Sequence, residues 1–193
     1  MIRNIWCIGR SYAEHAVELG NEVPQQAMIF LKAGSCATEM QTEISLANHD
    51  DEFHYELELA LRFDHTLSFS HYSCAIDLTN RSAQNRLKKK AHPWTLAKSF
   101  KGACPIGPWR EVSEINLADT ELQLTLNGQV KQQASTRLLL FPIEKMREYL
   151  IANYPVCPGD VYLSGTPSGV GPLNTGDKLE AHVGKAQFSW VVR

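Results

Sequence analysis

The stretch His54-Tyr55-Glu56-Leu57-Glu58-Leu59-Ala60-Leu61 decides the fold, because its residues alternate as they do in a β-strand. Side chains two apart on a strand point to the same face, so Tyr55 and the leucines share a buried face and the two glutamates share the other. Adjacent carboxylates repel each other, and neither is readily buried unpaired. A hard divalent cation held by carboxylate oxygens removes that repulsion. A solvated polar face is the plainer explanation of the same pair.

Length and composition indicate one soluble domain that spans residues 1–193. Hydrophobic residues make up 44% and charged residues 21% of the chain, and the net charge of -2 gives no general attraction to nucleic acid or anionic membranes. No secretory leader or membrane-spanning apolar run is found. The five cysteines form no Cys-x-x-Cys pair, so neither a zinc site nor a disulfide framework is indicated. We expect a cytoplasmic protein with reduced thiols that binds neither nucleic acid nor membranes.

The periodicity of the remaining chain predicts an α+β, β-rich fold. Strands are expected at residues 2–8, 27–31, 161–164, 178–183 and 188–192, and residues 122–126 lead into Asn127-Gly128, which is typical of a hairpin with a type I′ turn. Short helices are expected at residues 12–19, closed by Gly20-Asn21, at 78–90, and from Pro142 onward. Residues 33–53 and 62–73 show no regular element. Strands and helices do not alternate regularly, which favours a mixed β-roll or barrel-like sheet with short flanking helices.

Two groups of side chains suggest chemistry. Glu56, Glu58 and Asp77 offer oxygen ligands only, which suit Mg²⁺, Mn²⁺ or Ca²⁺ better than zinc, although three unrelated surface acids would give the same pattern. His15 and Glu18 lie three apart on a predicted helix and share one face. There the carboxylate can orient the imidazole as a base, while an exposed helix pair is the more common arrangement.

Two further segments have both a functional and an ordinary interpretation. The glycine-rich segment 164–171 follows a predicted strand, so its amides can bind a carboxylate or oxyanion, or can simply form a turn. It lacks the Gly-Lys-Ser/Thr ending of a Walker A loop. The basic run Arg86, Lys88, Lys89 and Lys90 is expected on a solvated helix face, not at a nucleic-acid surface.

Eight motifs, in order along nearly the whole chain, resemble the fumarylacetoacetate hydrolase family. They are Ile8-Gly9-Arg10-Ser11-Tyr12 with residues 15–21, the Glu-x-Glu strand at 55–60, the Asp-x-x-x-Arg-x-x-Gln segment at 77–84, Pro93-Trp94 with residues 97–100 and 105–108, Asn127-Gly128, Pro158-Gly159-Asp160, residues 165–171, and Gly176-Asp177. The resemblance implies a mixed β-roll flanked by helices, typically in a homodimer.

The same resemblance implies a role for each candidate residue. Mg²⁺ or Mn²⁺ would be held by Glu56, Glu58 and Asp77. The catalytic dyad, on a helix that closes over bound substrate, would be His15 and Glu18. Negative charge developing on oxygen would be stabilised by Lys98. The substrate carboxylate and the active-site water would be held by Arg10, Arg81, Gln84, Gly165 and Thr166.

The implied activity is that of a divalent-metal-dependent hydrolase, which cleaves a carbon–carbon bond in acylpyruvate-type 2,4-dioxo acids through a metal-stabilised enolate. An oxaloacetate decarboxylase or keto–enol tautomerase would use the same site and the same enolate. A non-catalytic protein that binds small acids and retains the fold is the alternative from a different class.

Three departures from the family pattern bear on this expectation. Only 19 residues separate Glu58 from Asp77, so the helix that usually bridges them must be trimmed or lost. Ser82 stands where the family commonly has aspartate, and we expect it to loosen the support of Arg81. Lys101 replaces an acidic residue, and we expect it to add positive charge near the site.

Overall fold

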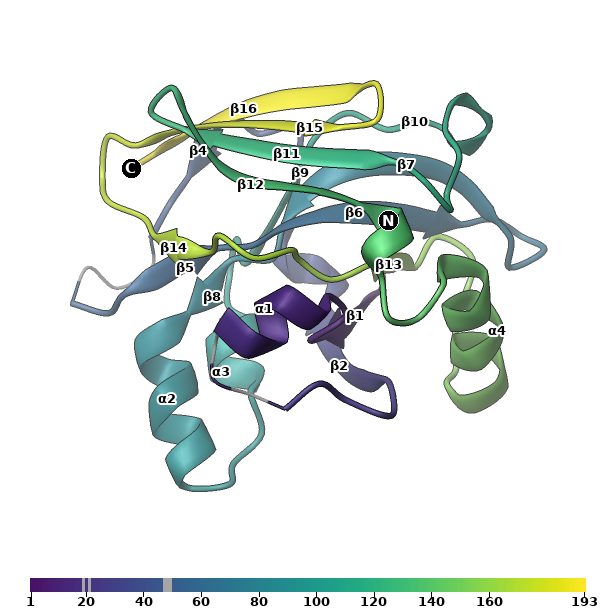
Figure 1. Ribbon diagram of the computed structural model, residues 1–193, viewed down its shortest axis with the longest axis horizontal. Helices are drawn as coiled ribbons and strands as arrows, with labels where there is room; N and C mark the ends of the chain where they lie inside the picture. The colour runs from purple at the N-terminus through teal and green to yellow at the C-terminus, as the bar shows by residue number, and fades with distance from the viewer. Residues whose placement is uncertain (19, 21, 47–49) are drawn as a thin grey trace.

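Curled sheets with short helices along one side make up the fold in the computed structural model, which describes residues 1–18, 20, 22–46 and 50–193 (Figure 1). Leu19 and Asn21, expected at the end of the first helix, lie outside the described residues, as do residues 47–49 of the segment expected to be irregular. Within the described part of the chain, no helix has the length and apolar character needed to cross a membrane.

An eight-stranded sheet mixes parallel and antiparallel pairs and follows the order β2-β1-β13-β6-β7-β9-β3, with β10 paired to β7. Its strands are β1 (Asn4–Gly9), β2 (Met28–Ala33), β3 (Ala37–Glu39), β6 (Leu57–Phe63), β7 (Phe69–Ile76), β9 (Cys104–Ile106), β10 (Arg110–Glu111) and β13 (Val161–Leu163). The mixture confirms the expected mixed sheet, in which helices do not alternate regularly with strands.

A five-stranded and a three-stranded sheet complete the β-structure. The first has the order β12 (Gln129–Ser135), β11 (Glu121–Leu126), β15 (Lys178–Val183), β16 (Ala186–Val192) and β4 (Glu43–Ile44). The second has the order β14 (Gly171–Pro172), β5 (Phe53–Tyr55) and β8 (Thr79–Asn80). The helices are α1 (Ala13–Glu18), α2 (Arg81–Lys89), α3 (Thr95–Lys98) and α4 (Ile143–Asn153), and single 3-10 turns occupy Gly34–Cys36, Val112–Glu114 and Thr136–Leu138.

The core lies between the five-stranded sheet and the β6–β7 hairpin, which run one above the other in Figure 1. Leu57, Leu59 and Leu61 of β6 are fully buried in one apolar cluster with Leu124 and Trp190 of the facing sheet. Burying a leucine side chain contributes about 1.5–3 kcal/mol. The predicted buried face of the Glu-x-Glu strand is therefore confirmed.

The opposite face of that stretch is also buried, which contradicts the solvated polar face that the sequence left open. Glu56 is 5% exposed and Glu58 is 2% exposed. The stretch is also two strands, because β5 ends at Tyr55 and β6 begins at Leu57. At Glu56 the chain leaves the three-stranded sheet and enters the eight-stranded one.

Residues 62–73, expected to be irregular, instead continue a hairpin. β6 and β7 pair antiparallel from Leu57↔Ile76 to Phe63↔Phe69. The turn between them is stabilised by the Asp64 carboxylate, which accepts hydrogen bonds from the amides of Thr66 and Ser68. The absence of a helix between Glu58 and Asp77, both in the described range 50–193, is confirmed.

Other predictions were wrong at element boundaries or within loops. Residues 33–53 contain β3 and β4 and are not wholly irregular. The helix expected at 78–90 begins at Arg81, because residues 79–80 form β8 and the Asn80 side chain caps the helix by accepting from the Ala83 amide at 2.8 Å.

The type I′ turn predicted for the hairpin is confirmed by φ values of 51° at Asn127 and 78° at Gly128.

Candidate active site

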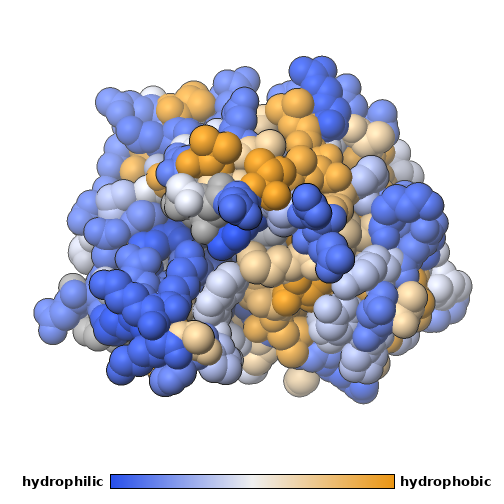
Figure 2. Space-filling view, turned by 60° about the horizontal axis from the view of Figure 1, so that its bottom comes forward, coloured by the Kyte–Doolittle hydropathy of each residue, from blue (hydrophilic) through white to orange (hydrophobic). Residues whose placement is uncertain are grey.

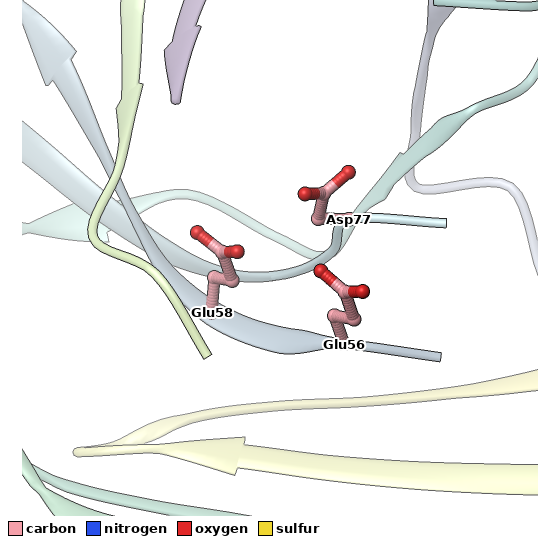
Figure 3. A group of neighbouring side chains, drawn as sticks. All are labelled: Glu56, Glu58 and Asp77. Atoms are coloured by element: carbon pink, nitrogen blue, oxygen red, sulfur yellow. The ribbon is translucent and has the colours of Figure 1, made fainter. Parts of the chain in front are cut away.

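The three acidic side chains predicted as metal ligands form one buried cluster. Glu56 lies between β5 and β6, Glu58 on β6, and Asp77 directly after β7. One carboxylate oxygen from each lies within 4.8 Å of the other two, and Figure 3 shows all three carboxylates directed to the same side of the hairpin. The pairing of Leu57 with Ile76 places Asp77 beside the Glu-x-Glu segment. The short connection between Glu58 and Asp77 therefore preserves the cluster.

Basic side chains neutralise two of the three carboxylates. Lys98 Nζ lies 2.8 Å from Glu56 Oε2 and 2.6 Å from Asp77 Oδ2. Asp77 also pairs with Lys32 at 2.7 Å, and Glu56 pairs with Arg81 at 2.7 Å. Burial alone would raise the pKa of Glu56, but Lys98 and Arg81 outweigh it and hold that pKa well below its usual range.

Glu58 differs from its two neighbours because it has no ion-pair partner among the residues that the structure describes. Its Oε2 accepts a 2.6 Å hydrogen bond from the Gly165 amide. Burial, reinforced by the charges of Asp77 and Glu56, raises the pKa of Glu58 well above its usual value. A cation bound between the carboxylates would relieve this repulsion. Three convergent oxygen donors with one unneutralised carboxylate fit a divalent ion such as Mg²⁺ or Mn²⁺.

A cavity beside the cluster gathers nine of the eleven residues predicted for the site. Those that line it are Arg10, His15, Glu56, Glu58, Asp77, Arg81, Gln84, Lys98 and Thr166. The other two contact residues that line the cavity: Glu18 bonds to His15, and Gly165 bonds to Glu58. Additional lining comes from Ile8, Gly9, Met28, Phe30, Lys88 and Trp94.

The predicted dyad is assembled, with its histidine buried and its glutamate exposed at the surface. His15 Nδ1 lies 3.2 Å from Glu18 Oε2, and the His15 side chain is buried. The second oxygen of Glu18 accepts a 2.9 Å hydrogen bond from the Gly169 amide. This bond ties helix α1 to the glycine-rich loop, so the carboxylate that orients the imidazole is itself held in place.

The remaining predicted side chains are held by contacts within the protein. Arg81 donates to Gln84 Oε1 at 2.6 Å as well as to Glu56, so its guanidinium supports a carboxylate of the cluster. The three donors of the Lys98 ammonium are engaged by Glu56, Asp77 and Thr79 Oγ1. Direct roles of these side chains toward a substrate stay predictions.

Two of the departures from the family pattern concern residues that do not line the cavity, Ser82 and Lys101. Ser82 Oγ accepts from the Glu52 amide at 3.0 Å, while Arg81 remains bound to Glu56 and Gln84. The expected loosening of Arg81 is not seen. Lys101 is exposed and does not line the cavity, and its effect on the charge near the site stays a prediction.

Sequence reasoning missed Lys32 and Gln132. Lys32 is fully buried and donates to the carbonyl oxygens of Leu78, Lys98 and Ala103 in addition to pairing with Asp77. A lone lysine directly after the apolar run 28–31 was the available signal. Gln132, also fully buried, accepts from the Leu57 amide and donates to Thr166 Oγ1. Nothing in its local pattern distinguishes it from its polar neighbours.

A mixed β-roll with a buried acidic cluster beside a histidine–glutamate pair defines a class of protein, the β-rich proteins with a buried, oxygen-lined site that could hold a metal ion. The chain belongs to the fumarylacetoacetate hydrolase family, because residues 4–189 match the family model described as fumarylacetoacetate (FAA) hydrolase C-terminal. This confirms the resemblance found in the sequence.

Relatives within this enzyme family are named for different reactions. The mitochondrial oxaloacetate tautomerase fahd-1 of Caenorhabditis elegans is 37% identical over 187 residues, covering 91% of this chain and 87% of that protein. The mitochondrial oxaloacetate decarboxylase of Dictyostelium discoideum is 33% identical over 195 residues, covering 94% and 88%. The structure of fumarylpyruvate hydrolase from Pseudomonas aeruginosa, in complex with Mn²⁺ and pyruvate, aligns with a TM-score of 0.92 at 25% identity over 99% of this chain and 89% of that one.

Proposed function

We propose that this protein is a divalent-metal-dependent enzyme that acts on oxaloacetate, as a keto–enol tautomerase or a decarboxylase. The observation that carries the proposal is that the buried three-carboxylate cluster and His15 line one cavity. Support for oxaloacetate comes from the relatives named as oxaloacetate tautomerase and oxaloacetate decarboxylase. The assignment of the whole range 1–193 to one catalytic domain, the homodimer and the cytoplasmic location stay predictions.

The acidic cluster would hold the metal ion. Glu56, Glu58 and Asp77 would be its ligands, and a bound Mg²⁺ or Mn²⁺ supplies Lewis-acid polarisation of a 2-oxo group. Lys32, Lys98 and Arg81 would fix the orientation of two of those ligands through the ion pairs described above.

His15 would move the proton. When its Nδ1–H donates to Glu18, its Nε2 is unprotonated and can act as a base. In tautomerisation, His15 takes a proton from C3 of oxaloacetate and returns it to the oxygen on C2, so one C–H bond breaks and one O–H bond forms. In decarboxylation, the C3–C4 bond breaks, CO₂ leaves, and C3 of the resulting enolate receives a proton that His15 has taken from solvent water.

Hydrolysis of acylpyruvates is the second candidate. It is favoured by the likeness to the fumarylpyruvate hydrolase that was solved with Mn²⁺ and pyruvate. For that reaction His15, oriented by Glu18, would take a proton from water as the water attacks the distal carbonyl.

The decisive experiment follows three reactions with one preparation of protein. Decay of the oxaloacetate enol absorbance, formation of pyruvate and loss of acetylpyruvate are measured with Mg²⁺ or Mn²⁺ and again with excess chelator. We expect metal-dependent turnover of oxaloacetate, lowered about 100-fold or more in Glu58→Gln, which corresponds to ~2.7 kcal/mol of transition-state stabilisation.

Two results would contradict the proposal. Turnover of acetylpyruvate alone would make the protein an acylpyruvate hydrolase. No turnover of either substrate, together with mutually dependent thermal stabilisation by Mg²⁺ and oxalate, would indicate the non-catalytic binding protein.

A further inference from the structure

The cavity contains two basic side chains that the acidic cluster does not neutralise. Of the four lysines and arginines that line it, Lys98 and Arg81 form ion pairs with the cluster. Arg10 and Lys88 form no ion pair with any residue in the described ranges. Lys88 comes from helix α2, on the side of the molecule where Figure 2 shows hydrophilic residues gathered.

Lys88 is held at the cavity by an aromatic ring and not by an acid. Its Nζ lies 5.7 Å from the ring centroid of Trp94, which lines the same cavity. By contrast, Arg86 on the same helix pairs with Asp51 at 3.0 Å. Burial, together with the cations of Arg81 and Arg10, lowers the pKa of Lys88. An unpaired ammonium group among other cations is stabilised when an anion binds beside it.

Arg10 reaches the same cavity from a strained backbone position. It directly follows β1 and has a φ of 58°, in the left-handed region that non-glycine residues rarely adopt. Such strain persists only where the surrounding structure imposes it, commonly at ligand sites.

We propose that Lys88 and Arg10 form a second anion subsite, where the cavity meets the surface, and that Lys88 makes the protein prefer dicarboxylic 2-oxo acids to monocarboxylic ones. This inference rests on the proposed function, because the first carboxylate and the 2-oxo group of the ligand would occupy the metal end of the cavity. The distal carboxylate then lies toward α2. Oxaloacetate has such a group, whereas acetylpyruvate has a neutral acetyl group in its place.

The test uses two unreactive ligands of equal length. 2-Oxoglutarate and 2-oxovalerate both have five carbons, a C1 carboxylate and a 2-oxo group, and they differ by one distal carboxylate. Their dissociation constants are measured by calorimetry with Mg²⁺-loaded wild type, Lys88→Gln and Lys89→Gln. Lys89 is the matched control, because it is exposed on the same helix and does not line the cavity.

We expect Lys88→Gln to weaken binding of 2-oxoglutarate about tenfold and to leave 2-oxovalerate within about twofold, because only the charged distal group loses its partner. Lys89→Gln should change neither constant. The KM for oxaloacetate should rise in Lys88→Gln with little change in kcat, while the kinetic constants for any acetylpyruvate turnover stay the same.

Each opposite outcome overturns the inference. If Lys88→Gln weakens binding of both ligands equally, Lys88 supports the shape of the cavity and does not contact the distal carboxylate. If Lys89→Gln weakens binding of 2-oxoglutarate as much as Lys88→Gln does, the effect is a general electrostatic attraction to the surface. A wild-type protein that binds both ligands alike, or neither, would exclude the subsite. Failure of the proposed function is a separate result, recognised by the absence of turnover in wild type.

Discussion

Replacing Gln132 by leucine should destabilise the protein more than the same replacement at its neighbour Gln133 on strand β12. Gln132 Oε1 accepts from the Leu57 amide at 2.9 Å, and its Nε2 donates to Thr166 Oγ1 at 2.8 Å and to the Pro167 carbonyl at 2.9 Å. It therefore joins the segment between the two cluster glutamates to the loop that carries Thr166. Leucine has a similar size and removes all three hydrogen bonds.

The magnitude follows from counting the buried groups that lose a partner. Each lost hydrogen bond costs about 1 kcal/mol net, and a buried amide left unsatisfied costs about 1–3 kcal/mol. The Leu57 amide has no water to replace Gln132, because both residues are fully buried. We therefore expect a loss of about 3 kcal/mol in the free energy of unfolding. With a urea m-value of ~2 kcal/mol/M, the midpoint falls by about 1.5 M.

The assay is urea denaturation of metal-free protein, which separates fold stability from metal binding. Gln133→Leu is the matched control, because Gln133 is adjacent, exposed and on the opposite face of β12. The control should stay within about 0.5 kcal/mol of wild type. A Gln132→Leu midpoint equal to that of Gln133→Leu would refute the account of Gln132 as a buried bridge.

The remaining predictions concern the Glu58 carboxylate and its support. Burial and the neighbouring acids raise the pKa of Glu58 above its usual value of 4.5. Between pH 4.5 and the raised pKa, the Glu58 carboxyl of the folded protein therefore retains a proton that a bound cation must displace. The raised pKa also means that the Glu58 contribution to metal-free stability is greatest below pH 4.5 and is lost as pH rises through the folded pKa. The rise in melting temperature on adding Mg²⁺ should therefore increase with pH over that range. In Glu58→Gln, Mg²⁺ should not raise the melting temperature. A rise in the wild-type protein that does not change with pH would argue against the raised pKa of Glu58. Gly165→Ala should lower stability by about 2 kcal/mol or more in urea denaturation, because φ is 86° and an added Cβ would lie 1.8 Å from Ser11 Oγ. Gly102→Ala, at a φ of 78° with open space, is the control and should lose about 1 kcal/mol.

Local sequence pattern determined much of the fold. The alternation of residues 122–126 and the Asn127-Gly128 pair predict the β11–β12 hairpin and its turn, because side-chain periodicity and positive φ are properties of neighbouring residues. The same holds for α4, whose first residue follows Pro142 as predicted. The second strand of the β6–β7 hairpin, Phe69–Ile76, escaped prediction because its polar residues mask the alternation.

The sequence by itself determined which residue types are available for the site: two glutamates separated by one residue, an aspartate 19 residues after the second, and a histidine three residues before a glutamate. Only the tertiary structure decided that the glutamates are buried, that Glu58 lacks the ion pair its neighbours have, and that Lys32 and Gln132 support the cluster. Gln132 lies 75 residues from the Leu57 amide it binds. Contacts over such separations depend on strand pairing and sheet packing, which local periodicity does not encode.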